Sequence, residues 1–281
     1  MNYCYQTPKS ILPAQQRIVV IGDIHGDWKA LIKALQKGKV INKNKSWVGG
    51  KTHLVQIGDI LDRGGRPSSY GDEQSEYKII KYLFKLKKYA QRAGGDVHIL
   101  LGNHEIMNIM GNFRYVSPMG LTDFHGQRRE MLKPGGKIAK ELACQTNSII
   151  KIGSWLFAHA GVIPNISGKY SIDKVNSIIR NFLLGNTKLS RESELIDFFW
   201  HRNYSSTPAK CGLLSRSLQD YESKYMAVGH TVQHGGINSA CNGQLWRVDV
   251  GLSEAFGNKK RKRRKCQVLE IADDHRVIVI N

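Results

Sequence analysis

The sequence lacks the features of secreted, membrane-spanning and thiolate-metal proteins. No apolar run reaches the roughly 18 residues that a transmembrane helix requires. The first ten residues are polar and include Pro8, unlike a secretory signal. The five cysteines are odd in number, and no two form a C-x-x-C pair for zinc or redox chemistry. We therefore expect a soluble intracellular protein of the cytoplasm, with reduced thiols, no disulfides and no membrane contact.

Acidic residues are scarce relative to basic ones. The chain has 23 Asp and Glu against 42 Lys and Arg, which gives a formal net charge of +19. Seven of the positive charges form one run, KKRKRRK, at Lys259–Lys265. Burying such a run without partners would cost too much, so residues 258–266 are expected to form a solvated basic loop. Nuclear import, nucleic-acid contact, an acidic partner, or a solvated insertion without a partner all fit this run.

The remaining composition is that of a folded protein. The chain has 281 residues, of which 41% are hydrophobic, enough for a packed core and too many for a disordered chain. We expect residues 1–16 to be an N-terminal extension and residues 17–281 to form a single domain. Segments 112–145 and 170–222 are less regular and are expected to cap the substrate side.

An apolar strand, a glycine-led polar turn and an amphipathic helix follow one another three times. The strands are expected at Arg17–Ile21, His53–Ile57 and Val97–Leu101. This order predicts βαβ units of an α/β fold, with parallel strands and ligands at their carboxyl ends. Later strand-like runs predict a second sheet packed on the first; they lie at Ser148–Ile152, Trp155–Ala158, Tyr225–Val228, Leu245–Val250, Val268–Ile271 and Val277–Ile280.

Five glycine-flanked turns after strand-like runs carry acids, amides or imidazoles. The segments are IGDIHG, IGDILDRG, LGNHE, FAHAG and VGHT. One such residue alone is usually a hydrogen-bonded structural group, but strand ends do not need five turns of this composition. Because glycine allows close approach of the backbone, we expect these side chains to meet around one centre. They are Asp23, His25, Asp59, Asn103, His159 and His230.

The chemistry of these side chains predicts the type of metal. They offer oxygen and nitrogen donors without thiolate, which favours Mn, Fe or Zn over calcium. Three imidazoles with three carboxylate or amide groups suit two ions, and Asp59 can bridge them. Two ions about 3.5–4 Å apart can clamp an in-line displacement at phosphorus and supply hydroxide near neutral pH. We therefore expect two divalent metal ions, with Mn as first choice and Fe or Zn as alternatives.

Three motifs in one order, GDIHG, GDILDRG and GNHE, resemble the metal-dependent phosphoprotein phosphatase superfamily. Further segments are similar to its Shewanella-like phosphatase branch: IMNIMGNFRYV after GNHE, HAGV, WHR, VGHTVQ and VDVGLSEAFG. The resemblance runs from about Arg17 to Ile271. It implies the calcineurin-like metallophosphoesterase fold, with two central mixed β-sheets flanked by helices and a helical cap region.

The resemblance also implies the ligands of each metal ion. The first ion would be bound by Asp23, His25 and the bridging Asp59. The second ion would be bound by Asp59, Asn103, His159 and His230.

Catalytic and phosphate-binding roles follow from the same resemblance. His104 would be the general acid that protonates the leaving oxygen, and Asp62 would orient it and keep it charged. Phosphate oxygens would be held by Arg63, by Arg202 of the WHR segment and by Asn103. Glu105 of GNHE is expected to support its loop and not to bind metal.

We therefore expect a phosphoprotein phosphatase that hydrolyses phosphoserine, phosphothreonine or phosphotyrosine by direct attack of a metal-bridging hydroxide. Its partner would be a phosphorylated protein or peptide. One alternative is a dinucleoside or nucleoside polyphosphate hydrolase, whose leading motifs are nearly the same. A nuclease of the same fold is disfavoured because Val232 replaces the second His of its usual G-H-x-H. A catalytically dead scaffold is disfavoured because every expected ligand position is retained.

Overall fold

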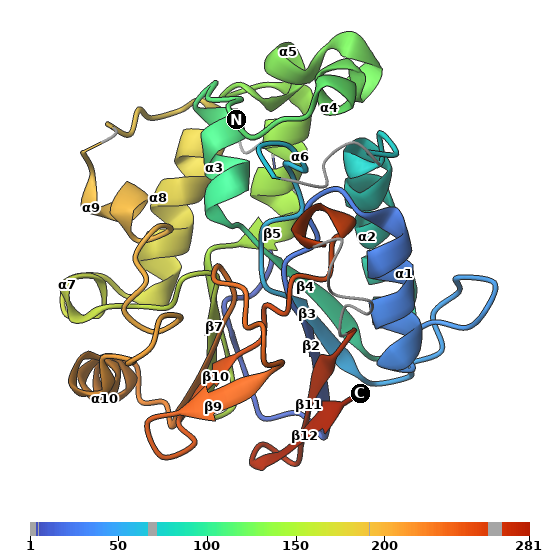
Figure 1. Ribbon diagram of the computed structural model, residues 1–281. Coiled ribbons are helices and arrows are strands. Elements are labelled where there is room, and N and C mark those ends of the chain that lie inside the picture. The colour runs from blue at the N-terminus through green and yellow to red at the C-terminus, as the bar shows by residue number, and fades with distance from the viewer. Residues whose placement is uncertain (1–3, 5, 67–71, 191, 258–265) are drawn as a thin grey trace.

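Two β-sheets lie face to face between two layers of helices (Figure 1). The computed structural model describes residues 4, 6–66, 72–190, 192–257 and 266–281. Within these residues each sheet has six strands, and both sheets mix parallel and antiparallel pairs. The predicted architecture of two mixed sheets flanked by helices is confirmed.

The first sheet contains the three predicted βα units. Its parallel strands are β2 (Arg17–Ile21), β3 (His53–Gln56), β4 (Asp96–Leu100) and β5 (Thr146–Asn147). Two further strands, β11 (Val268–Ala272) and β12 (Arg276–Ile280), extend it beside β2 in antiparallel pairing. The prediction that all late strands form the second sheet was wrong for these two. Pairing with β11 covers the edge of β2, which would otherwise carry unpaired backbone groups.

The second sheet is built around strands from the middle of the chain. Its order is β1 (Ile11–Leu12), β6 (Ile149–Ile152), β7 (Trp155–Ala158), β8 (Tyr225–Val228), β10 (Leu245–Arg247) and β9 (Asn238–Ala240). Strands β7, β8 and β10 are parallel to one another. Their carboxyl ends therefore share one edge, as do those of β2, β3 and β4 in the other sheet.

Strand β2 shows how the sequence builds this sandwich. Ile18 and Val20 lie in the core between the sheets, together with side chains of the second sheet such as Phe157. Val19 and Ile21 lie in the other core, under the helices. Because both faces are buried, the strand is apolar throughout and shows no polar alternation.

Helices cover both outer faces. Helices α1 (Trp28–Lys37) and α2 (Glu76–Arg92) lie on one side in Figure 1, and α2 packs on β4. On the other side, α8 (Ile172–Leu184) packs on α6 (Lys137–Gln145) and on β6. This layer also contains α7 (Pro164–Ser167), α9 (Glu194–Asp197) and α10 (Cys211–Asp220).

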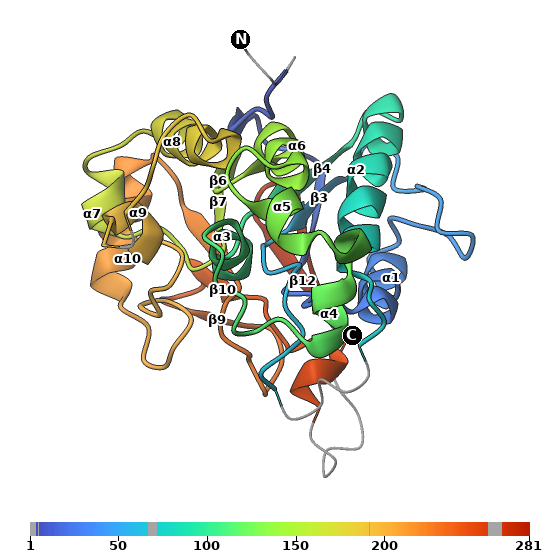
Figure 2. The ribbon, with the colours of Figure 1, turned by 90° about the horizontal axis from the view of Figure 1, so that it is seen from above.

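Short helices lie over the carboxyl ends of the strands. From above, α3 (Asn103–Ile109) lies between the two helical layers (Figure 2). Beside it are α4 (Pro118–Thr122), η2 (Phe124–Gly126) and α5 (Arg128–Leu132), all within the segment 112–145 predicted as a cap. The single-domain division stays a prediction.

The prediction of no disulfides was wrong. Cys4 is bonded to Cys144 and Cys211 to Cys241, with sequence separations of 140 and 30 residues. Among the described residues Cys266 remains as a free thiol. Pairs so distant in sequence leave no local spacing signal, because the fold alone brings them together.

Two other sequence features have simple outcomes. The basic run Lys259–Lys265 lies outside the described residues. No helix in the described part of the chain has both the length and the apolar character needed to cross a bilayer.

Asn176 offers a test of how the helical layer is attached to the second sheet. Its buried Oδ1 accepts hydrogen bonds from the backbone N–H groups of Ser148 and Ile149, and Nδ2 donates to Ser10 Oγ and to the carbonyl of Ile149. Asn176→Ala leaves these buried groups unpaired and should lower the free energy of unfolding by about 2 to 4 kcal/mol. Urea denaturation measures this, and the exposed Asn186→Ala should stay within about 0.5 kcal/mol of wild type.

Candidate active site

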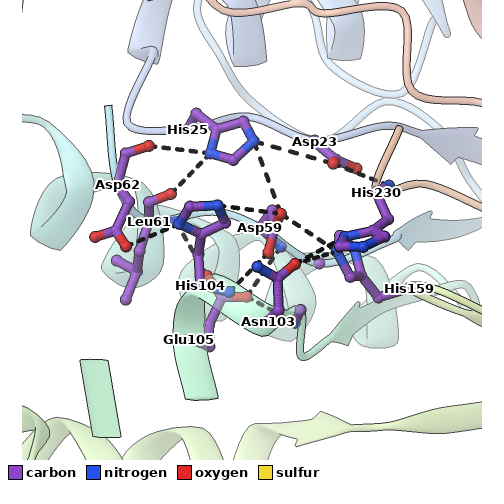
Figure 3. A network of polar contacts seen from close by, with 12 residues as sticks. Asp23, His25, Asp59, Leu61, Asp62, Asn103, His104, Glu105, His159 and His230 are labelled. Carbon is purple, nitrogen blue, oxygen red and sulfur yellow. Dashed lines mark hydrogen bonds and ion pairs between the residues drawn. The ribbon is translucent and has the colours of Figure 1, made fainter. Parts of the chain in front are cut away.

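The six predicted metal ligands lie together at one edge of the two sheets (Figure 3). Asp23, Asp59 and Asn103 follow the ends of β2, β3 and β4 in the first sheet. His159 and His230 follow the ends of β7 and β8 in the second sheet. The site therefore lies where the carboxyl ends of both sets of parallel strands face one another. All six side chains belong to residues that are at least nine-tenths buried.

The turns at these strand ends are tight enough to require unusual backbone. His25, Asp59 and His230 have positive φ values of 44°, 52° and 69°, a strained conformation for residues with a Cβ and one that clusters at functional sites. Glycine is required beside them. A Cβ on Gly102 would lie 2.2 Å from Asp59 Oδ1, and one on Gly229 would lie 2.4 Å from Asp23 Oδ1.

Three of the histidines are oriented in the same way. One ring nitrogen of each faces a backbone carbonyl: His25 Nδ1 lies 3.0 Å from Leu61 O, His159 Nδ1 lies 3.0 Å from Ile57 O, and His230 Nε2 lies 3.0 Å from Trp200 O. A carbonyl only accepts hydrogen bonds, so it fixes the N–H on that nitrogen. The other nitrogen then faces the centre, where it could bind a metal ion as metal-binding histidines do.

The donor atoms form two groups that share Asp59. Asp59 Oδ2 lies 3.8 Å from His25 Nε2 and 3.2 Å from His159 Nε2. Asn103 Oδ1 lies 3.0 Å from His159 Nε2 and 2.9 Å from His230 Nδ1. Asp23 Oδ2 lies 4.0 Å from His25 Nε2. Two groups of side chains could each hold a metal ion, His25 with Asp59 and His104, and Asp59 with His159 and His230. They share the Asp59 carboxylate, as a bridged pair of ions requires.

The ionisation of the site also fits cations. Burial lowers the pKa of His230 to about 3 and holds the pKa of His25 well below its usual range, so both rings are neutral and free to bind metal. Burial, followed by the nearby Asp249 carboxylate, raises the pKa of Asp23 well above its usual range. Among the described residues Asp23 Oδ1 is buried and has no hydrogen-bond partner. A buried acceptor without a donor is costly, and a metal ion would satisfy it.

His104 differs from the three other histidines. Its Nδ1 lies 2.8 Å from the carboxylate oxygen Oδ2 of Asp62, whereas the other three rings face backbone carbonyls. A carboxylate stabilises the charged imidazolium, the form that can give up a proton. Nε2 points to the centre and lies 3.9 Å from Asp59 Oδ2. The structure thus places His104 beside the ligand set in the orientation of a proton donor.

Asp62 is itself held by a buried network. Its Oδ1 accepts hydrogen bonds from Asn108 Nδ2 at 2.8 Å and from Arg128 Nη2 at 2.9 Å. Arg128 also pairs with Glu76 at 2.7 Å. Arg128 lies in the segment 112–145, belongs to no motif and was not predicted from the sequence. That segment therefore reaches beneath His104 and fixes its carboxylate partner.

Glu105 ties two of the turns together. Its carboxylate accepts the backbone N–H groups of Gly102 and of three consecutive residues, Asp59, Ile60 and Leu61, at 2.7–3.0 Å. The expectation that Glu105 supports its loop and does not bind metal agrees with these contacts.

The two predicted arginines are placed differently. Arg63 is only 1% exposed, and its guanidinium lies 3.5 Å from Asp27 and 3.6 Å from Glu254. Among the described residues its Nε and Nη1 are buried without a hydrogen-bond partner, and its role in phosphate binding stays a prediction. Arg202 lies at the rim, where Nη1 donates to the carbonyl of His230 at 3.0 Å and to the hydroxyl of Thr231.

Two more residues at the site were missed from the sequence. Asp249 is buried and lies two residues beyond β10, so it follows the same rule as the predicted ligands. The signal was present, but the strand was expected to continue to Val250. Burial raises the pKa of Asp249 to about 6. Arg66 is the second residue, and its Nη2 lies 3.3 Å from His104 Nε2.

Comparison with known proteins agrees with this geometry. The match to the calcineurin-like phosphoesterase family covers residues 16–234. The chain belongs to this family. It is therefore a metallophosphoesterase, a hydrolase of phosphoric ester bonds, in a family whose members use a dinuclear metal centre.

Its relatives place this metallophosphoesterase in the Shewanella-like branch, as predicted. It is 31% identical to Shewanella-like protein phosphatase 2 of Arabidopsis thaliana, over 94% of this chain and 77% of the relative. It is 34% identical to Shewanella-like protein phosphatase 1 of Plasmodium berghei, over 84% of this chain and 67% of the relative. A solved structure, the cold-active protein-tyrosine phosphatase of a psychrophilic Shewanella species, superposes with a TM-score of 0.79 at 25% identity and covers 98% of this chain and 83% of that one.

The role of Glu105 leads to a prediction for the metallophosphoesterase. Glu105→Ala removes the acceptor of four backbone N–H groups and should lower the free energy of unfolding by about 3 kcal/mol or more. It should also reduce metal content, because the turns of Asp59 and Asn103 lose their common support. Denaturation and elemental analysis after reconstitution with Mn measure both effects. Glu141→Ala removes a carboxylate from a partly exposed pair with Lys81 and should change stability by less than about 1 kcal/mol.

Proposed function

We propose that the protein is a phosphoprotein phosphatase that hydrolyses phosphomonoesters of serine, threonine or tyrosine side chains. The observation that carries this proposal is the pairing of His104 with the buried Asp62 directly beside the shared donor set. A phosphomonoester needs cations around its equatorial oxygens and a proton for the departing alkoxide. The donor set is suited to the first requirement and the His104–Asp62 pair to the second.

Each residue has a definite task in this proposal. Asp23, His25 and Asp59 would hold one ion, and Asp59, Asn103, His159 and His230 the other, with Mn expected first and Fe or Zn as alternatives. Bound there, two such ions supply hydroxide near neutral pH and stabilise the charge on the phosphoryl group. His104 Nε2–H donates its proton to the leaving oxygen while Asp62 holds the ring by Nδ1. Asn108 and Arg128 keep Asp62 in place through its other oxygen.

Aromatic side chains surround the centre and support a side-chain substrate. The ring of Tyr115 lies 5.1 Å from that of His104, Phe256 lies 5.0 Å from His25, and Trp200 lies 6.3 Å from His230. Such walls suit the apolar stem of a phosphorylated amino acid. The names of the relatives, two protein phosphatases and a protein-tyrosine phosphatase, favour a phosphoprotein over the alternative of a nucleoside polyphosphate.

The general acid is tested by His104→Asn. This change removes a proton donor without removing a proposed metal ligand, so turnover of a phosphoserine peptide should fall by about 10²–10⁴-fold at unchanged metal content. The loss should be smaller for p-nitrophenyl phosphate, because its leaving group departs without a proton. Steady-state kinetics on the Mn-reconstituted protein and elemental analysis measure these effects. His234→Asn, at an exposed site four residues from His230, should behave as wild type.

Equal losses of turnover and metal in His104→Asn would make His104 a ligand and not the acid. The substrate class is tested on the same preparation with phosphoserine and phosphotyrosine peptides, a dinucleoside polyphosphate and single-stranded DNA. We expect the peptides to be hydrolysed with the highest kcat/KM. Faster cleavage of the polyphosphate or of DNA would overturn the proposal.

A further inference from the structure

A groove on the outer helical layer lies away from the turns that carry the proposed metal ligands. It is formed between helix α2 and the loop 44–47 before β3, and its volume is about 560 Å³. Figure 1 shows this loop projecting beside α1 and α2. The groove reaches Arg92, the last residue of α2, from which the chain returns to the amino end of β4. The proposed active site lies at the opposite, carboxyl ends of the strands.

The segments that form this face carry charge of one sign. Residues 28–58 contain seven lysines and no Asp or Glu. Residues 77–95 contain five lysines, one arginine and again no Asp or Glu. These two segments supply α1, the loop of the groove and all of α2 beyond its first residue. This part of the surface therefore attracts an anionic partner.

The cations that line the groove are not neutralised by the protein. Lys45, Lys85 and Arg92 are exposed, and within the described part of the chain none of them pairs with a carboxylate. Other lysines of α2 are paired: Lys81 lies 2.7 Å from Glu141, and Lys87 lies 3.1 Å from Asp96. The three groove cations are thus available to carboxylates of a partner.

Between these cations the groove is apolar and already shaped. Trp47, Tyr82 and Tyr89 line it together with Leu86, which is buried. The hydroxyl of Tyr82 donates to the carbonyl of Lys45 at 2.9 Å and so ties the loop to α2. A hollow that exists before binding costs little ordering when a ligand enters it. Its size and aromatic lining suit an apolar side chain.

The rings of this face already have cations near them, which favours a peptide over a nucleic acid. Lys78 Nζ lies 4.0 Å from the ring centre of Trp28. Lys85 Nζ and Arg92 Cζ lie 5.8 and 5.9 Å from the ring centre of Tyr89. Single-stranded nucleic acids bind by stacking bases on aromatic faces, which would displace these cations. Carboxylates of a peptide can pair with the cations where they are.

We propose that this groove docks an acidic segment of the phosphoprotein substrate, in which an apolar side chain stands between carboxylates. The apolar side chain enters among the three aromatic rings, and the carboxylates pair with the three groove cations. This inference rests on the proposed function and extends it to a second contact with the substrate, remote from the phosphate. Such a contact raises the local concentration of the phosphoester without touching the chemistry.

The first test measures binding of an unphosphorylated peptide of glutamates around one phenylalanine, by fluorescence anisotropy on the full-length Mn-reconstituted protein. The double variant Lys85→Glu/Arg92→Glu should weaken binding by about 10- to 100-fold, because two attractive pairs become repulsive. The matched control Lys174→Glu/Lys188→Glu changes the net charge equally at exposed lysines on and after α8. It should weaken binding by less than about threefold, because exposed charges at a distance are screened by salt.

Further probes test the occupant. The same peptide with serine in place of phenylalanine should bind about 10-fold more weakly, because the apolar side chain no longer fills the groove. Tyr89→Ala should weaken the phenylalanine peptide by about 3- to 10-fold and the serine peptide much less. Should Lys85→Glu/Arg92→Glu fail to fold, Lys85→Ala/Arg92→Ala gives the same comparison.

Several results would overturn the proposal. They are no binding of the acidic peptide to wild type, equal weakening in the groove and control variants, and equal affinity for the phenylalanine and serine peptides. Tighter binding of oligothymidylate than of the acidic peptide, lost in the groove variant, would make the groove a nucleic-acid site and would also overturn it.

Kinetics separate this proposal from the proposed function. The groove variant should hydrolyse p-nitrophenyl phosphate as wild type does, and its KM should rise for a phosphoserine peptide joined to the acidic segment by a flexible linker. If wild type binds the acidic peptide but hydrolyses no phosphopeptide, the proposed function is wrong, and the anisotropy comparison still decides whether the groove takes an acidic peptide. If wild type hydrolyses phosphopeptides and the groove variant binds the acidic peptide equally well, only the inference on the groove is wrong.

Discussion

The proposed role of each histidine of this site depends on the hydrogen bond at one ring nitrogen, the one that faces away from the shared donor set. That nitrogen faces a backbone carbonyl oxygen in His25, His159 and His230, and the Asp62 carboxylate in His104. A carbonyl fixes the N–H on that nitrogen and leaves the other nitrogen facing the donor set, which suits a cation. At His159 the pKa is raised in spite of burial, because the inward nitrogen lies 3.2 Å from the Asp59 carboxylate. A carboxylate favours the charged ring, which suits proton donation. Two kinds of partner thus distinguish the three histidines that are proposed as metal ligands from the proposed general acid.

These partners are available because of how the sheets are arranged. Backbone carbonyls from the turn after β3, such as Ile57 and Leu61, face the site because parallel strands end at one edge. Positive φ values at Asp59 and Asp62 turn the chain sharply enough to present these groups. Glu105 offsets part of the strain by accepting four N–H groups of the turns. The site therefore cannot loosen without loss of these backbone hydrogen bonds.

Arg63 belongs to the GDILDRG motif, and Arg66 lies three residues further along the chain. They lie on the same turn with the same charge, yet one pairs with a buried carboxylate of α1 and the other reaches the imidazoles. Buried Asp27 and Asp62 each require a cation or donors nearby, and the three-dimensional position of each acid selects which arginine it receives. Asp62 is paired in this way with Arg128, which comes from the distant segment 112–145. The disulfides Cys4–Cys144 and Cys211–Cys241 likewise join segments whose spacing carries no signal.

The sequence alone determined the three parallel βα units and the side chains that meet at their ends. Uniformly apolar strands, glycine-led turns and acids or imidazoles directly after them are local signals, and parallel strands bring such residues to one edge. Tertiary structure decided which sheet β11 and β12 join, which cysteines pair, and that Asp249, Arg128 and Arg66 lie beside the predicted residues. The partners of long side chains and of the late strands are distant in sequence, and which partner each one contacts depends on burial and charge in three dimensions.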